Sequence, residues 1–127
     1  MERTVIATDK APAAIGPYAQ ANKIGDLIYT SGQIPLDVNT GEIVGVTVTE
    51  QTARAIENLS AVLEAAGSGL DKVIKTTVFL SNINDFAEMN KVYAEYFKGD
   101  LLPSRSAVGV SGLPKGALVE IEAVATI

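Results

Sequence analysis

The sequence has no histidine and no cysteine among its 127 residues. Without these residue types, a Ser-His-Asp triad, a cysteine nucleophile and the usual zinc sites are all excluded. Any chemistry must therefore come from carboxylates, lysine, tyrosine, arginine, hydroxyl groups or backbone amides. The absence of cysteine agrees with a cytosolic protein but does not require one.

Positive charge is also scarce, with 10 lysines and arginines against 15 aspartates and glutamates and a net charge of −5. Because basic residues form no cluster, nucleic-acid binding is not expected as the main role. An anionic substrate would need a local positive group. Of the three arginines, only Arg105 lies in the strand-rich C-terminal region.

Long hydrophobic runs are absent as well. The apolar stretches are interrupted well short of a membrane span, and Met1–Thr4 lacks the apolar region of a signal peptide. We therefore expect a cytoplasmic protein that does not bind membranes. With 47% hydrophobic residues and no linker or repeat, residues 1–127 are predicted to form a single globular domain.

Segments that are rich in β-branched and aromatic residues, or bounded by turn residues, predict six strands. They are Thr4–Ala7, Ala19–Ile24, Leu27–Ser31, Val73–Leu80, Ser104–Val110 and Ala117–Thr126. Gly25-Asp26, between the second and third segments, is typical of a hairpin turn. Ser31-Gly32 follows the third segment and, taken alone, is typical of a strand end with a bulge.

Two helices are predicted between these strands. The first runs from Thr47, which has the capping-box spacing to Glu50, to about Ala66, and Gly67 supplies its C-terminal stop. The second opens at Asn84 or Asp85 and runs to about Phe97. Its apolar stripe is typical of a core-facing helix and consists of Phe86, Met89, Tyr93, Tyr96 and Phe97. This order of elements predicts an α+β two-layer domain with one mixed sheet of about six strands and both helices on one face.

The last two predicted strands flank a loop of turn residues, so we expect them to form a hairpin. With residue 110 opposite 117, Arg105 faces Glu122, and Ala107 faces Glu120. All four side chains then share one face of the sheet. A guanidinium and two carboxylates among apolar neighbours make this face a candidate functional site. The alternative is an ordinary cross-strand ion pair between Arg105 and Glu122, which contributes about 0.2–1 kcal/mol.

Apolar residues occupy both faces of this predicted hairpin, whereas two helices can cover only one face of a sheet. The uncovered face is expected to be buried by self-association.

Six stretches resemble the RidA (YjgF-type) family of reactive intermediate deaminases, in order and over nearly the whole chain. They are residues 11–21 (APAAIGPYAQA), 30–35 (TSGQIP), 58–67 (NLSAVLEAAG), 73–79 (VIKTTVF), 103–106 (PSRS) and 119–123 (VEIEA). The resemblance implies a chorismate-mutase-like fold and a homotrimer with a sheet-lined central barrel and pockets at the subunit clefts. It also implies hydrolysis of the imines of 2-aminoacrylate and 2-aminocrotonate to 2-keto acids and ammonia, without a metal or organic cofactor.

The resemblance assigns roles to particular residues. Arg105 is the expected anchor, since a guanidinium holds a carboxylate in a bidentate manner. Glu120 is implied to position the attacking water, with Glu122 as its rival for that role. The remaining substrate-binding residues implied are Tyr18, Ser31, Gly32, Asn90 and Ala107.

Two qualifications belong to this assignment. Asn90, taken alone, is typical of a polar residue beside an apolar helix stripe. Many relatives carry cysteine where this chain has Ala107, so no thiol chemistry is expected there, and the proposed role belongs to the backbone.

Three other functions remain open from the sequence. The first is a 2-keto-acid-binding regulatory protein that uses the same anchor without turnover. The second is nucleic-acid cleavage, which the acidic charge and the missing histidine disfavour. The third is chorismate mutase activity, which rests on fold analogy alone.

Overall fold

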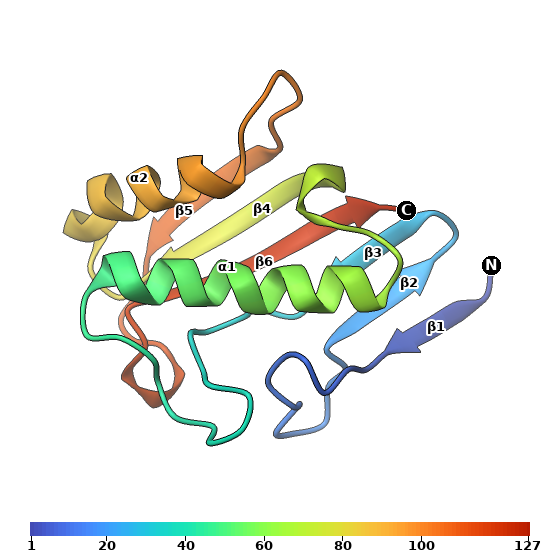
Figure 1. The fold of residues 1–127 in the computed structure, drawn as a ribbon, viewed down its shortest axis with the longest axis horizontal. Helices are drawn as coiled ribbons and strands as arrows, with labels where there is room; N and C mark the ends of the chain where they lie inside the picture. Colours follow the sequence, from blue (N-terminus) through green and yellow to red (C-terminus); the bar gives the residue numbers. More distant parts are fainter.

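The computed structural model describes all 127 residues and contains six strands that belong to one sheet (Figure 1). They are β1 (Arg3–Ile6), β2 (Ala21–Ile24), β3 (Leu27–Thr30), β4 (Val73–Leu80), β5 (Ser104–Gly109) and β6 (Val119–Thr126). Their order across the sheet is β1-β2-β3-β6-β4-β5. Only β4 and β5 run parallel, so the sheet is mixed, as predicted.

The two helices are α1 (Val48–Ala65) and α2 (Phe86–Tyr96). The capping box at the start of α1 is confirmed: the Glu50 backbone N–H donates to the Thr47 hydroxyl at 3.2 Å, and the Glu50 carboxylate accepts from the Thr47 N–H at 3.2 Å. α1 ends before Gly67, whose φ of +84° favours glycine. Neither helix is long and apolar enough to cross a membrane.

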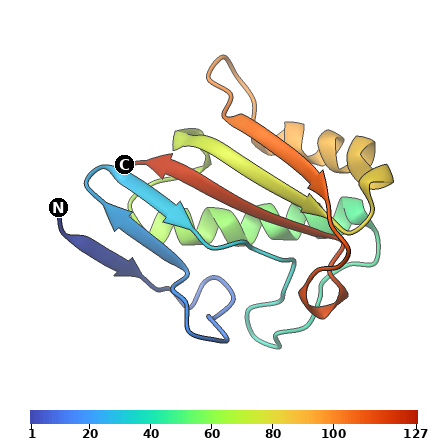
Figure 2. The same ribbon diagram turned by 180° about the vertical axis from the view of Figure 1, so that it is seen from behind.

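Both helices cover the same face of the sheet, and the opposite face is bare (Figures 1 and 2). Along β6, residues alternate between buried positions that face the helices and half-buried positions on the bare face. Ile121 is fully buried and packs in the same core as Leu59 and Leu63 of α1. The predicted two-layer α+β architecture is therefore confirmed.

The predicted C-terminal hairpin is wrong. β5 pairs with β4 in parallel, and β4 lies between β5 and β6. The connection from β4 to β5 passes through α2 as a crossover, and this brings β5 to the far side of β4. Thr76 of β4 is the neighbour of both Arg105 and Ala123, so Arg105 is in line with Ala123 and not with Glu122.

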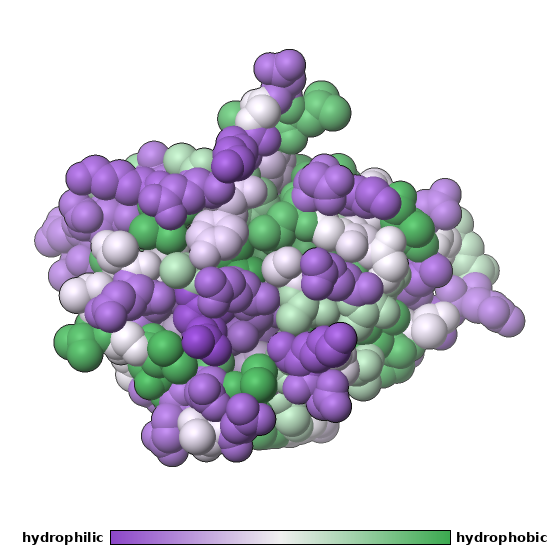
Figure 3. Space-filling model, in the orientation of Figure 1, coloured by the Kyte–Doolittle hydropathy of each residue, from purple (hydrophilic) through white to green (hydrophobic).

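The two surfaces of the molecule differ in polarity. Hydrophilic side chains predominate over the helix layer (Figure 3). The strands, in contrast, keep large apolar side chains exposed, with Val5 at 63%, Tyr29 at 48% and Val108 at 42%. Self-association through the bare sheet face stays a prediction, and these exposed side chains are the reason for it.

Candidate functional site

In the candidate site, the Glu120 side chain lies in close contact with Gly32. A two-way backbone bridge joins Gln33 to Ile121, with N···O distances of 2.8 and 3.0 Å, and holds the segment after β3 against β6, where the Glu120 side chain reaches Gly32. A Cβ atom on Gly32 would lie 2.7 Å from Glu120 Cδ. Real Cβ atoms do not approach other atoms so closely, so any side chain at position 32 would force the Glu120 side chain to move.

The Glu120 carboxyl has a perturbed acidity. Burial raises its pKa above the usual value, and the negative charge of Glu122 raises it further. The two glutamates lie two residues apart on β6 and so share the bare face. A raised pKa makes a carboxylate a stronger proton acceptor near neutral pH, as a base that activates water requires.

Tyr18, Ser31, Gly32 and Glu120 line one cavity of about 310 Å³. The fold brings these four predicted site residues together, and their role in substrate binding or catalysis stays a prediction. The Ser31 hydroxyl donates to the Ala19 carbonyl at 2.6 Å. This hydrogen bond ties the residue after β3 to the loop before β2 and so holds that loop in place. Several apolar residues complete the walls: Pro12, Ala13, Ile15, Ile34, Leu36 and Pro114.

Arg105 lies in a different cavity, of about 410 Å³, on the helix side of the sheet. Its Nη1 donates to Asn90 Oδ1 at 2.7 Å. The guanidinium carbon lies 4.7 Å from the ring centre of Tyr93 and 5.4 Å from that of Phe86, both within cation–π range. No carboxylate lies within 4.0 Å of it. Arg105 is therefore held in position while most of its donors remain free for an anion.

The structure does not bring Arg105 and Glu120 together within one chain. Arg105 contacts α2, on the side where Thr76 is buried. Glu120 is the neighbour of Phe79, which alternates with the buried residues of β4 and so lies on the bare face. Ala107 packs against the core on the helix side, next to Val78. The predicted site is thus divided between two faces of the sheet.

The aromatic rings that support Arg105 were not predicted from the sequence. Phe86 and Tyr93 were assigned to the core stripe of the second helix, yet both rings also face the Arg105 guanidinium. A signal was present, since Phe86, Asn90 and Tyr93 are spaced i, i+4, i+7 and must share one helix face. The Tyr93 hydroxyl is hydrogen-bonded to Thr76 Oγ1 at 2.7 Å, which fixes the ring under the guanidinium.

Neither cavity has the donor set of a metal centre. No group of three or more acidic side chains in the chain is arranged to hold a metal ion.

Comparison with known proteins places these features in a family. The family model described as Endoribonuclease L-PSP matches residues 8–127. A RutC family protein of Pyrococcus abyssi is 56% identical over 98% of this chain and 98% of its own length. A Mus musculus protein named 2-iminobutanoate/2-iminopropanoate deaminase is 50% identical over 97% of this chain and 90% of its own.

A solved structure agrees with this comparison. The crystal structure of E. coli TdcF with bound serine superposes with a TM-score of 0.92 at 44% identity and covers 98% of both chains. The family model spans nearly the whole chain, the relatives match along their length, and the fold is the same. The chain therefore belongs to the RidA (YjgF) family.

Proposed function

We propose that this protein hydrolyses reactive imines, the tautomers of 2-aminoacrylate and 2-aminocrotonate, to 2-keto acids and ammonia. The observation that carries the proposal is Arg105, a guanidinium held by an amide and two rings but without a carboxylate partner. Such a group is suited to bind the carboxylate that every 2-imino acid bears. The deaminase name of the mouse relative, at 50% identity, supports the same activity.

The reaction adds water across the carbon–nitrogen double bond. Glu120 accepts a proton from the water as its oxygen bonds to the imine carbon. Starting from the protonated imine, this addition gives a carbinol with a neutral amino group. Glu120 then returns its proton to the amino nitrogen, which leaves as ammonia, while the hydroxyl group loses its proton to solvent and the carbon–oxygen double bond of the 2-keto acid forms. Backbone groups at Gly32 and Ala107 hold the reacting nitrogen or the oxygen that replaces it.

A second copy of the chain is part of this proposal. Arg105 and Glu120 lie on opposite faces of the sheet, so one chain cannot present both to one small substrate. In a homotrimer, the bare face of one chain would meet the β5 edge of the next, and each cleft would combine Glu120 of one copy with Arg105 of another. The trimeric state and the cytosolic location stay predictions, and light scattering tests the first.

The test couples a threonine dehydratase to this protein and follows both keto-acid formation and the imine trapped by semicarbazide. We expect wild type to accelerate the first and reduce the second. Arg105→Ala should lower the acceleration by at least about 10²-fold, because binding and orientation of the carboxylate are both lost. Arg54→Ala is the matched control, since it removes the same charge from a surface ion pair on α1.

Two results would decide against the proposal. Activity of Arg105→Ala within a few-fold of Arg54→Ala would remove Arg105 from the site. No effect of wild type on either signal, with 2-oxobutanoate still bound, would favour the regulatory 2-keto-acid-binding function instead.

A further inference from the structure

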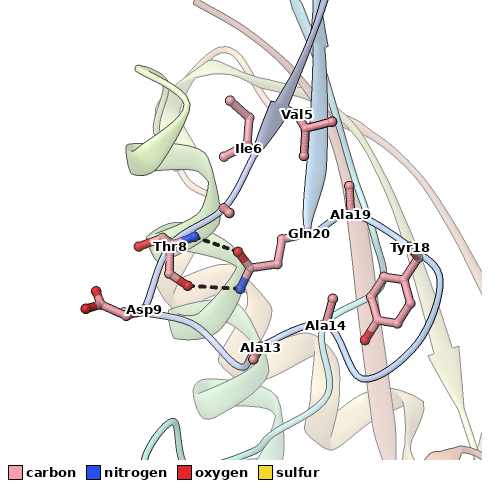
Figure 4. Close-up of a pocket in the computed structure, with 10 residues that line it drawn as sticks. Val5, Ile6, Thr8, Asp9, Ala13, Ala14, Tyr18, Ala19 and Gln20 are labelled. Carbon is pink, nitrogen blue, oxygen red and sulfur yellow. Dashed lines mark hydrogen bonds between the residues drawn. The ribbon is translucent and has the colours of Figure 1, made fainter.

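A third hollow, larger than the two cavities described above and open to solvent, adjoins the cavity that contains Glu120. It has a volume of about 760 Å³ and lies between the end of β1 and the loop that connects β1 to β2 (Figure 4). Most of its lining is apolar: Val5, Ile6, Ala7, Ala13, Ala14 and Ala19. Tyr18 borders this hollow and also the smaller cavity that contains Glu120. The two spaces are thus neighbours whose linings share Ala13, Tyr18 and Gln20, and Tyr18 is the only aromatic side chain among these three.

Tyr18 is loosely held. Half of the residue is exposed, and its hydroxyl accepts only one hydrogen bond, from the Ile15 N–H at 3.4 Å. This distance is longer than an ordinary N–H···O bond. The ring lies against Gly16, where a Cβ atom would be 3.6 Å from Tyr18 Cδ2. No large side chain at position 16 therefore supports the ring.

The frame of the larger hollow, in contrast, does not depend on Tyr18. The buried Gln20 side chain donates to the carbonyl oxygen of Thr8 at 3.1 Å (Figure 4). It also donates to the carbonyl oxygen of Pro12 at 2.7 Å. Its Oε1 accepts from the Thr8 N–H at 2.7 Å. These bonds join the end of β1 to the loop, so the hollow should keep its shape when the Tyr18 ring is removed.

We propose that Tyr18 limits the length of the substrate side chain, and that the hollow it shares with the site is a subsite for longer, unbranched apolar side chains. The inference rests on the proposed function and specifies the substrate class. Short 2-imino acids fit the 310 Å³ cavity. A longer alkyl chain needs the Tyr18 ring removed or turned aside, and it then contacts the alanine-rich walls.

The test compares 2-iminobutanoate with 2-iminohexanoate, each generated from its amino acid by an amino-acid oxidase in the presence of catalase. The measured quantity is the ratio of kcat/KM for the long substrate to that for the short one. In Tyr18→Ala this ratio should rise about tenfold, because two further methylenes gain apolar contacts. Tyr18→Phe keeps the ring and should keep the wild-type ratio.

A second substitution locates the subsite. Ala14 is exposed, lines the larger hollow and is not part of the smaller cavity. Adding Ala14→Leu to Tyr18→Ala fills the hollow and should return the ratio to the wild-type value. Tyr18→Ser is a second opening variant should Tyr18→Ala fail to fold by circular dichroism.

A ratio that does not rise in the folded opening variant, or a raised ratio that Ala14→Leu leaves unchanged, would overturn the inference. Failure of the proposed function has a different signature, since wild type would then hydrolyse neither imine. In that case the same ratio is measured as the affinity for 2-oxohexanoate over 2-oxobutanoate by calorimetry. An affinity ratio that rises in Tyr18→Ala and returns to the wild-type value when Ala14→Leu is added then supports the subsite. An affinity ratio that does not change in this way overturns it.

Discussion

The contact between Gly32 and Glu120 leads to the sharpest prediction, for the variant Gly32→Ala. The backbone of Gly32 does not have positive φ, so alanine is allowed there by conformation. The new Cβ would lie 2.7 Å from Glu120 Cδ and 2.9 Å from Cγ, whereas ordinary contact begins at 3.4 Å. The Glu120 carboxyl group must therefore move by roughly 0.7 Å or more, as the difference of these distances shows.

This displacement should affect catalysis far more than stability. A shift of about 1 Å in a catalytic group costs on the order of 10²-fold in rate, so we expect kcat to fall by that factor. Overpacking against a half-buried, flexible side chain should cost only about 1 kcal/mol of unfolding free energy. The assays are imine hydrolysis with semicarbazide trapping and thermal unfolding on the same sample.

The matched control is Gly112→Ala. Gly112 also lacks positive φ, and a Cβ atom there would meet nothing within 4 Å. It should retain wild-type kcat. If Gly32→Ala kept kcat within threefold of Gly112→Ala, the close approach would not position Glu120 for catalysis and the reasoning would be refuted.

Three further predictions concern acidity and packing. Because the Glu122 charge raises the pKa of Glu120, Glu122→Gln should shift the acid limb of the kcat/KM profile to lower pH, and an unshifted limb would contradict the coupling. A raised native pKa means that ionisation of Glu120 opposes folding, so wild type should lose stability as pH rises from about 4.5 through that raised pKa. Glu120→Gln should not show this loss in unfolding titrations at several pH values. The Thr52 hydroxyl is fully buried without a hydrogen-bond partner, so Thr52→Val should stabilise the protein by about 1 kcal/mol in thermal unfolding, with Thr52→Ala as the cavity-forming comparison.

Local signals in the sequence predicted the elements of the fold well. The Thr47 capping box, the Gly67 helix stop and the Gly25-Asp26 turn each act within a few residues, so neighbouring residues alone determine them. The strand Val73–Leu80 was predicted with its observed bounds. The second helix begins at Phe86, close to its predicted start, although the Asp85 side chain forms no capping bond.

The pairing of β5 could not be predicted in the same way. Consecutive strands are neighbours in most sheets, and the turn residues 111–116 favoured a hairpin. The observed partner is β4, because the crossover through α2 returns the chain parallel to β4. The prediction that Arg105 shares a sheet face with Glu120 was wrong for the same reason. A change of strand partner or of register by one residue moves a side chain to the other face of the sheet.

The missing histidine and cysteine and the scarce arginines determined which chemistry was available. The family stretches predicted which residues belong to the site, and that assignment stays a prediction. These are properties of residue identity and of near neighbours, and the sequence records them directly. Only the tertiary structure decided that Glu120 lies over Gly32, that Arg105 rests on two rings of α2, and that the two groups occupy opposite faces. Strand order and burial decide such facts, because they depend on contacts between segments that are distant along the chain.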